Sequence, residues 1–188
     1  MLIDCATSSV NTRARDKSSG STSCLPTVSV PIQARCVPGR TWSFIRLAAG
    51  AEVIVTGTRA AASEYSTDLA GMGYRQFVAT DAEATVELAK SLETLDVLIN
   101  NAGATFPGGL DEYTPEGFDA ALQLNLVGPY RLTHALHRKL RKSNAPGGGA
   151  VVSLVSMAAY RAVSMVPGYG SARWRPIERC RWCPAMAP

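Results

Sequence analysis

Segments typical of β-strands alternate with segments of helical character through the middle of this chain. Four apolar runs have the length and composition of buried strands, at 51–56, 76–79, 95–99 and 150–155. Between them, apolar residues compatible with helices occur over 60–69, 84–92 and 114–142. Strands joined by helices predict a parallel sheet with helices on both faces. The expected fold class is therefore α/β, with a doubly wound parallel sheet.

Local chemistry marks the starts of two of these helices. Thr114 is a favourable N-cap, Pro115 suits the first helical position, and Glu116 complements the positive end of the helix dipole. Pro167 and Gly168 predict the start of a last helix.

Short polar segments follow three of the predicted strands, at 57–59, 100–103 and 153–156. The carboxyl ends of parallel strands meet at one edge of a sheet, and ligands bind there, beside a topological switch point. The sequence therefore predicts a ligand site built from these three segments.

The polar residues also fall in a characteristic order. Asn100-Asn101-Ala102-Gly103 follows a strand, Asn125 lies in the long helix, and Ser156 stands thirteen residues before Tyr169, which Arg173 follows at the fourth position. Over 47–172 the chain resembles the short-chain dehydrogenase/reductase family, which has Asn-Asn-Ala-Gly, a helical Asn, a Ser and Tyr-x-x-x-Lys in this order. The resemblance implies a Rossmann-like sheet and an oxidoreductase that moves hydride between a nicotinamide cofactor and a carbonyl or alcohol.

The resemblance implies catalytic roles for Ser156, Tyr169, Asn125 and Arg173. A free tyrosine has a pKa of about 10, so a nearby cation must favour the phenolate for proton exchange near neutral pH. Arg173 would supply that cation, Ser156 would hold the substrate oxygen, and Asn125 would hold a water that returns the proton.

Five residues are candidates for binding NAD or NADP. The resemblance places Asn101, Ala102 and Gly103 against the cofactor, because glycine lets backbone approach closely. Arg59 favours NADP if its guanidinium takes the 2′-phosphate, and is otherwise a solvated loop residue. Asp81 either contacts the adenine amine or caps the helix that follows it.

The chain departs from the family pattern at both ends of the resemblance. No Gly-x-x-x-Gly-x-Gly turn precedes 48–51, so the pyrophosphate lacks its usual backbone cradle. Arg173 stands in place of lysine, and the two cations differ in shape and reach. Pro176 is expected to interrupt the last helix. We therefore expect an incomplete sheet whose central first strand and whose elements after the last helix are atypical or missing.

Three segments are expected along the chain: an atypical, disordered 1–46, a partial dehydrogenase domain at 47–172, and an atypical tail at 173–188. All five cysteines and all three tryptophans lie in the two outer segments. Within the first of them, 28–30 has the composition of a short strand. This partition suggests out-of-frame translation at both flanks of an ancestral dehydrogenase gene. The alternative function is therefore a catalytically inactive remnant or a partner-binding fragment.

Composition argues against several other classes of protein. No apolar run reaches the ~18 residues that span a membrane, and the basic residues show no interleaved aromatics that would indicate nucleic-acid binding. His134 and His137 are expected to be ordinary helix residues, and Cys180 and Cys183 form a lone pair, so no metal site is expected. We expect a cytoplasmic protein that acts on a small carbonyl or alcohol and that pairs with a second copy through the 114–142 helix.

Overall fold

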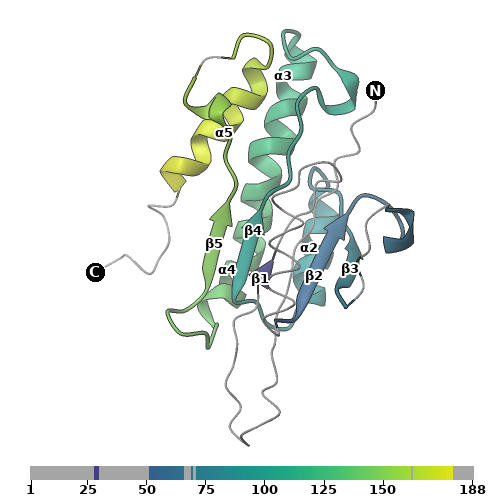
Figure 1. Ribbon diagram of the computed structural model, residues 1–188, viewed down its shortest axis with the longest axis vertical. Coiled ribbons are helices and arrows are strands. Elements are labelled where there is room, and N and C mark those ends of the chain that lie inside the picture. The colour runs from purple at the N-terminus through teal and green to yellow at the C-terminus, as the bar shows by residue number, and fades with distance from the viewer. Residues whose placement is uncertain (1–27, 30–50, 66–68, 70, 162, 180–188) are drawn as a thin grey trace, which may run out of the picture.

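Five parallel strands form a single sheet in the order β3-β2-β1-β4-β5, which confirms the predicted α/β class. The computed structural model describes residues 28–29, 51–65, 69, 71–161 and 163–179. Its strands are β1 Val28–Ser29, β2 Val53–Gly57, β3 Gly73–Gln76, β4 Val97–Asn100 and β5 Ala150–Ser153. Its α-helices are α2 Ala82–Ser91, α3 Pro115–Leu122, α4 Gly128–Arg141 and α5 Pro167–Arg179. Figure 1 shows α3 and α5 beyond the carboxyl ends of β4 and β5.

Strand β1 occupies the centre of the sheet with only two residues, so the first strand is present but atypically short, and the short strand expected at 28–30 is confirmed at Val28–Ser29. Val28 pairs with Val53 on one side and with Val97 on the other. So short a strand is held by backbone hydrogen bonds to both neighbours, and it carries too few residues for a periodic sequence pattern. The carboxyl end of β1 is the topological switch point, because the strand order leads from it to β2 on one side and to β4 on the other.

Apolar side chains are buried on both faces of the sheet. One cluster joins the sheet to α2 and α4, and it includes Ile54, Leu88, Leu98 and Leu136. Alternation along the strands sends a second cluster to the opposite face, and it includes Val53, Val55 and Ile99. Each fully buried side chain of this kind contributes about 1.5–3 kcal/mol. The two clusters fix β2 and β4, and with them the strand ends that carry the predicted site.

The helix predicted at 60–69 is wrong for the residues described there. A 3₁₀ turn forms at Ala62–Glu64, and Tyr65 is extended. The Glu64 carboxylate accepts a hydrogen bond from the Ala61 N–H at 2.8 Å, and the Tyr65 hydroxyl accepts one from the Arg59 N–H at 3.1 Å. These side-chain bonds hold the segment in a tight turn and compete with a longer helix.

The long helix predicted over 114–142 forms with an interruption. The Thr114 hydroxyl caps it by accepting a hydrogen bond from the Gly117 N–H at 3.1 Å, as predicted. A π-helical turn, Gln123–Val127, then separates α3 from α4. Such turns occur frequently at functional sites, and this one contains Asn125.

Helix α5 begins at Pro167 as predicted and continues through Pro176 to Arg179. The expectation that Pro176 interrupts this helix is therefore wrong. Proline costs about 3 kcal/mol within a helix, but the helix also packs against α3, which offsets that cost. Arg173 consequently lies within α5.

Other expectations concern residues outside the described part of the chain. These residues include Cys180, Cys183 and nearly all of 1–46. Among the described residues, no helix is both long enough and apolar enough to cross a membrane.

Candidate active site

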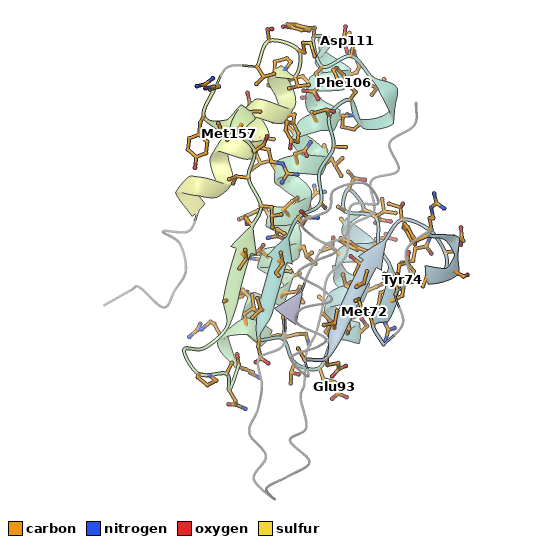
Figure 2. The ribbon with its side chains drawn as sticks, viewed as in Figure 1. Met72, Tyr74, Glu93, Phe106, Asp111 and Met157 are labelled. Atoms are coloured by element: carbon orange, nitrogen blue, oxygen red, sulfur yellow. The ribbon has the colours of Figure 1, made fainter. Side chains whose placement is uncertain are left out.

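Most of the predicted site residues lie around the carboxyl ends of β4 and β5. Asn101 to Ala104 follow β4, Ser156 follows β5, and Tyr169 belongs to α5 beyond these strand ends (Figure 1). Figure 2 shows Phe106 and Met157 at this end of the molecule and Glu93 at the opposite end. The fold thus brings segments that are far apart in sequence to one edge of the sheet.

Asn125 is fully buried and is bonded to the segment that follows β4. Its amide nitrogen donates to the carbonyl oxygens of Ala104 and Ala121, both at 2.9 Å, and its Oδ1 accepts from the Ala104 N–H at 3.1 Å. Both amide protons are therefore used within the protein, and one lone pair of Oδ1 remains. The side chain fixes the backbone just after the Asn-Ala-Gly turn.

Arg173 is 5% exposed, and its guanidinium joins the ends of two strands. Nη2 donates to the Ala102 carbonyl oxygen at 2.8 Å, and Nη1 donates to the Leu154 carbonyl oxygen at 3.0 Å. Its Nε is buried and has no hydrogen-bond partner among the residues that the structure describes. The planar guanidinium places one donor on each carbonyl, so the arginine links the end of β4 to the end of β5.

Gly103 gives the guanidinium the space that it occupies. A Cβ on this residue would lie 1.5 Å from Nη2 of Arg173 and 2.4 Å from Oδ1 of Asn125. Only glycine avoids these overlaps. The close approach expected at Gly103 is thus real, but here the group that approaches is a side chain of the protein itself.

Ser156 and Tyr169 lie on two segments that pack together. The Ser156 hydroxyl accepts a hydrogen bond from the Ala158 N–H at 3.2 Å and caps the 3₁₀ turn Met157–Ala159. A Cβ on Gly170, the residue after Tyr169, would lie 3.1 Å from the Ala158 carbonyl oxygen. The Tyr169 ring lies with its centroid 5.3 Å from Cζ of Arg173, within range of a cation–π interaction.

Glu112 is a residue of this site that the sequence did not reveal. It is 1% exposed, its Oε1 accepts from the Phe106 N–H at 2.9 Å, and its Oε2 accepts from the Tyr169 N–H at 2.8 Å. Phe106 has φ 50°, in the left-handed region that is rare for residues other than glycine. A glutamate just before a helix N-cap looks in sequence like a solvated loop residue, so no signal indicated its burial.

The candidate residues after β2 form a second polar region. The Arg59 guanidinium lies over the Tyr65 ring, 5.0 Å from its centroid, and it donates to the Glu64 carbonyl oxygen. The Tyr74 hydroxyl donates to the Arg59 carbonyl oxygen at 2.6 Å. Burial raises the pKa of Tyr74 above its ordinary value, and its hydrogen bond with Tyr65 raises it further.

Asp81 has the capping geometry that was one of its two predicted roles. Its Oδ1 accepts from the Glu83 N–H at 2.8 Å and from the Ala84 N–H at 3.2 Å, at the start of α2. Its contact with an adenine stays a prediction.

Comparison with known proteins assigns the chain to a family. A family profile described as short chain dehydrogenase matches residues 39–175, and the chain belongs to this family. An uncharacterized oxidoreductase of Thermotoga maritima is 38% identical over 84 residues, which are 43% of this chain and 32% of that protein. L-xylulose reductase of Mesocricetus auratus is 29% identical over 136 residues, which are 72% of this chain and 55% of that protein. The chain thus spans about half or less of the length of these relatives.

Solved structures agree with the fold. A short-chain dehydrogenase from Streptomyces avermitilis superposes with a TM-score of 0.63 at 25% identity, over 78% of this chain and 57% of that one. A structure described as a short chain dehydrogenase/reductase family protein gives a TM-score of 0.64 at 23% identity, over 78% of this chain and 62% of that one. The Rossmann-like expectation is therefore confirmed.

The family implies a nicotinamide cofactor, and the residues on both sides of β1 fit such a group. Within the described part of the chain, two buried polar atoms lack a hydrogen-bond partner there: Oγ1 of Thr56, near the end of β2, and Nε of Arg173, beside the turn after β4. Buried polar groups are normally hydrogen-bonded, so unsatisfied atoms on both sides of a switch point are consistent with a polar ligand. The fit does not extend to the pyrophosphate, because the sequence after β1 has no glycine-rich turn.

Proposed function

We propose that this chain is an NAD(P)-dependent oxidoreductase that acts on a carbonyl or alcohol. The observation that carries the proposal is the convergence of Ser156, Tyr169 and Arg173 on the carboxyl ends of β4 and β5, where family members react. The cofactor, when bound, supplies or accepts the hydride. The residues of this chain hold the substrate oxygen and move the proton.

Tyr169 is the proton donor or acceptor in this proposal, through its phenol oxygen. Arg173 provides the positive charge that favours the phenolate, since its guanidinium lies near the Tyr169 ring. Ser156 holds the substrate oxygen with its hydroxyl. Asn125 acts through the backbone, because its amide protons are bonded to Ala104 and Ala121 and are not free to hold a water.

The cofactor proposed for this chain is NADP in preference to NAD. Arg59 follows β2, and its forked guanidinium suits a 2′-phosphate. To bind the phosphate, Arg59 would have to leave the Glu64 carbonyl. Arg59→Ala is expected to weaken binding of NADPH and to leave binding of NADH unchanged.

The substrate proposed for this site is apolar around its reacting group. Two loops lie near the first turn of α5: one precedes α3 and contains Phe106 and Tyr113, and the other precedes α5 and contains Ser164. The Tyr113 hydroxyl joins them by donating to the Ser164 carbonyl oxygen. Together they expose large apolar side chains, among them Phe106, Leu110, Met157, Tyr160 and Met165. Such a surface favours an apolar substrate over a sugar or a carboxylate.

A second candidate function is a non-catalytic remnant that binds another protein. The absent glycine-rich turn favours it. A turnover assay decides between the oxidoreductase and the non-catalytic remnant. The full chain is incubated with NADPH and a panel of apolar ketones and aldehydes, and the loss of reduced-nicotinamide absorbance is followed. The proposal requires oxidation that Tyr169→Phe abolishes and that Tyr130→Phe, at an exposed position on α4, leaves intact, and equal rates in all three proteins would refute it.

A further inference from the structure

A buried carboxylate connects the loop after β4 with the helix that carries Tyr169. Glu112 comes from the loop before α3, and its two oxygens accept the N–H groups of Phe106 and Tyr169 at 2.9 and 2.8 Å. Glu112 and Phe106 both precede Tyr169 by more than fifty positions in the sequence. Its neighbour Tyr113 adds a second link, to Ser164.

The carboxylate is held by backbone amides. Among the described residues, no hydrogen bond or ion pair from a lysine, arginine or histidine side chain to Glu112 is present, although the residue is almost fully buried. A buried charge needs strong hydrogen bonds. The first N–H groups of a helix provide them, because they lack partners within the helix and lie at its positive end.

Tyr169 is one of those orphan donors. In α5 the first hydrogen bond within the helix runs from the Gly170 N–H to the Val166 carbonyl oxygen at 3.0 Å. Tyr169 precedes Gly170, so its N–H has no acceptor in its own helix and is bonded to Glu112. The glutamate therefore fixes the backbone from which the tyrosine side chain extends.

The packing around the carboxylate leaves little room for movement. A Cβ on Gly168 would lie 2.8 Å from Cβ of Ala121 and 3.3 Å from Oε2 of Glu112. Helix α5 thus lies close against α3 at this point. A shift of the Glu112 oxygens would move the first turn of α5, and with it Tyr169 relative to Arg173.

We propose that Glu112 is a positioning residue for Tyr169, which it orients through the N–H of Tyr169 and couples to the loop that contains Phe106. This inference rests on the proposed role of Tyr169. It adds that the loop after β4 and the reacting tyrosine move together, through a single carboxylate.

The test is amide hydrogen exchange of the full chain by NMR, without cofactor. In the wild type we expect the Tyr169 and Phe106 amides to be protected. In Glu112→Gln one carboxylate oxygen is replaced by an NH₂ group, which faces a backbone N–H and cannot accept its proton. Because one hydrogen bond to a charged group is lost, at least one of the two amides should exchange about tenfold faster or more. Glu116→Gln makes the same chemical change at an exposed position and should alter neither.

A spectroscopic readout separates positioning from general stabilisation. With 3-fluorotyrosine incorporated, the ¹⁹F resonance of Tyr169, assigned through Tyr169→Phe, should shift or broaden in Glu112→Gln, while those of Tyr65 and Tyr74 stay in place. Equal changes at all three tyrosines would indicate a general structural role and overturn the proposal.

The wild-type protein alone can also refute the inference, even if Glu112→Gln fails to fold. An unprotected Tyr169 amide in the wild type would show that the bond to Glu112 does not persist. Neither readout requires NADPH. A failure of cofactor binding would therefore leave these results standing, and would count against the proposed function alone.

Discussion

Arg173 donates from Nη2 to the carbonyl oxygen of Ala102 at 2.8 Å, across the space that a side chain on Gly103 would fill. The residue in the position of the family's lysine thus bonds the protein's own backbone, and it ties α5 to the ends of β4 and β5. This arrangement makes one side chain responsible both for the shape of the site and for its positive charge.

Removing the guanidinium should destabilise the fold. Arg173→Met leaves the Ala102 and Leu154 carbonyls without their donor, so the free energy of unfolding should fall by about 2–4 kcal/mol. Arg173→Lys should lose less, because the ammonium keeps N–H donors and the charge but lacks the planar fork that places one donor on each carbonyl. Urea unfolding measures both, with Arg161→Met at an exposed position as the control. A loss in Arg173→Met no larger than in the control would contradict the link between the strands.

Asn125 should contribute to stability through its backbone partners. Asn125→Ala leaves an N–H and two carbonyls near Ala104 and Ala121 unsatisfied and should cost about 2–4 kcal/mol. Asn144→Ala, at an exposed site, is expected to change stability by less than about 0.5 kcal/mol. Thermal and urea unfolding provide the comparison, and similar values for the two variants would be inconsistent with the buried network.

The unpartnered hydroxyl of Thr56 predicts an unusual outcome. Thr56→Val removes a buried polar atom without changing the shape of the side chain, so it should leave stability unchanged or raise it by up to about 1–2 kcal/mol. Thr85 is equally buried, but its hydroxyl donates to the Asp81 carbonyl oxygen at 2.9 Å. Thr85→Val should therefore lose about 1 kcal/mol. Equal losses in the two variants would show that Thr56 has a partner after all.

Tyr74 should make the fold sensitive to alkaline pH. The unfolded chain loses this phenol proton near pH ~10, whereas the folded chain retains it, because burial and the hydrogen bond with Tyr65 raise the pKa. The unfolded state then binds fewer protons, so stability is complete below that pH and falls as the pH rises above it. Tyr74→Phe should flatten this fall, measured by urea unfolding at several pH values. Tyr160→Phe, at an exposed position, should leave it unchanged.

The sequence predicted the parts of the fold that repeat. Apolar runs separated by helical segments predicted β2, β4 and β5, and the N-cap at Thr114 predicted the start of α3. The order from Asn101 to Tyr169 predicted which segments share an edge of the sheet. These features depend on periodicity and spacing, which a sequence displays directly.

The features that the sequence did not predict depend on contacts between segments that are far apart in the sequence. The composition of 28–30 indicated a short strand, but the place of β1 at the centre of the sheet depends on backbone partners from both neighbouring strands. The π-helical turn at Asn125 and the burial of Glu112 both require backbone groups from distant segments. Arg173 was predicted as the cation beside Tyr169, and its bonds to Ala102 and Leu154 have no counterpart in the spacing of the motif.

The most direct test of the central claim is a fluorescence titration of the full chain with NADPH. The claim is that the edge formed by β1, β4 and β5 is a nicotinamide site. It predicts saturable binding with a Kd below about 1 mM, which corresponds to a binding free energy of about −4.1 kcal/mol. It further predicts weaker binding in Gly103→Ala, where the new Cβ displaces Arg173. A folded protein that shows no saturation at millimolar NADPH would contradict the claim and favour the non-catalytic remnant.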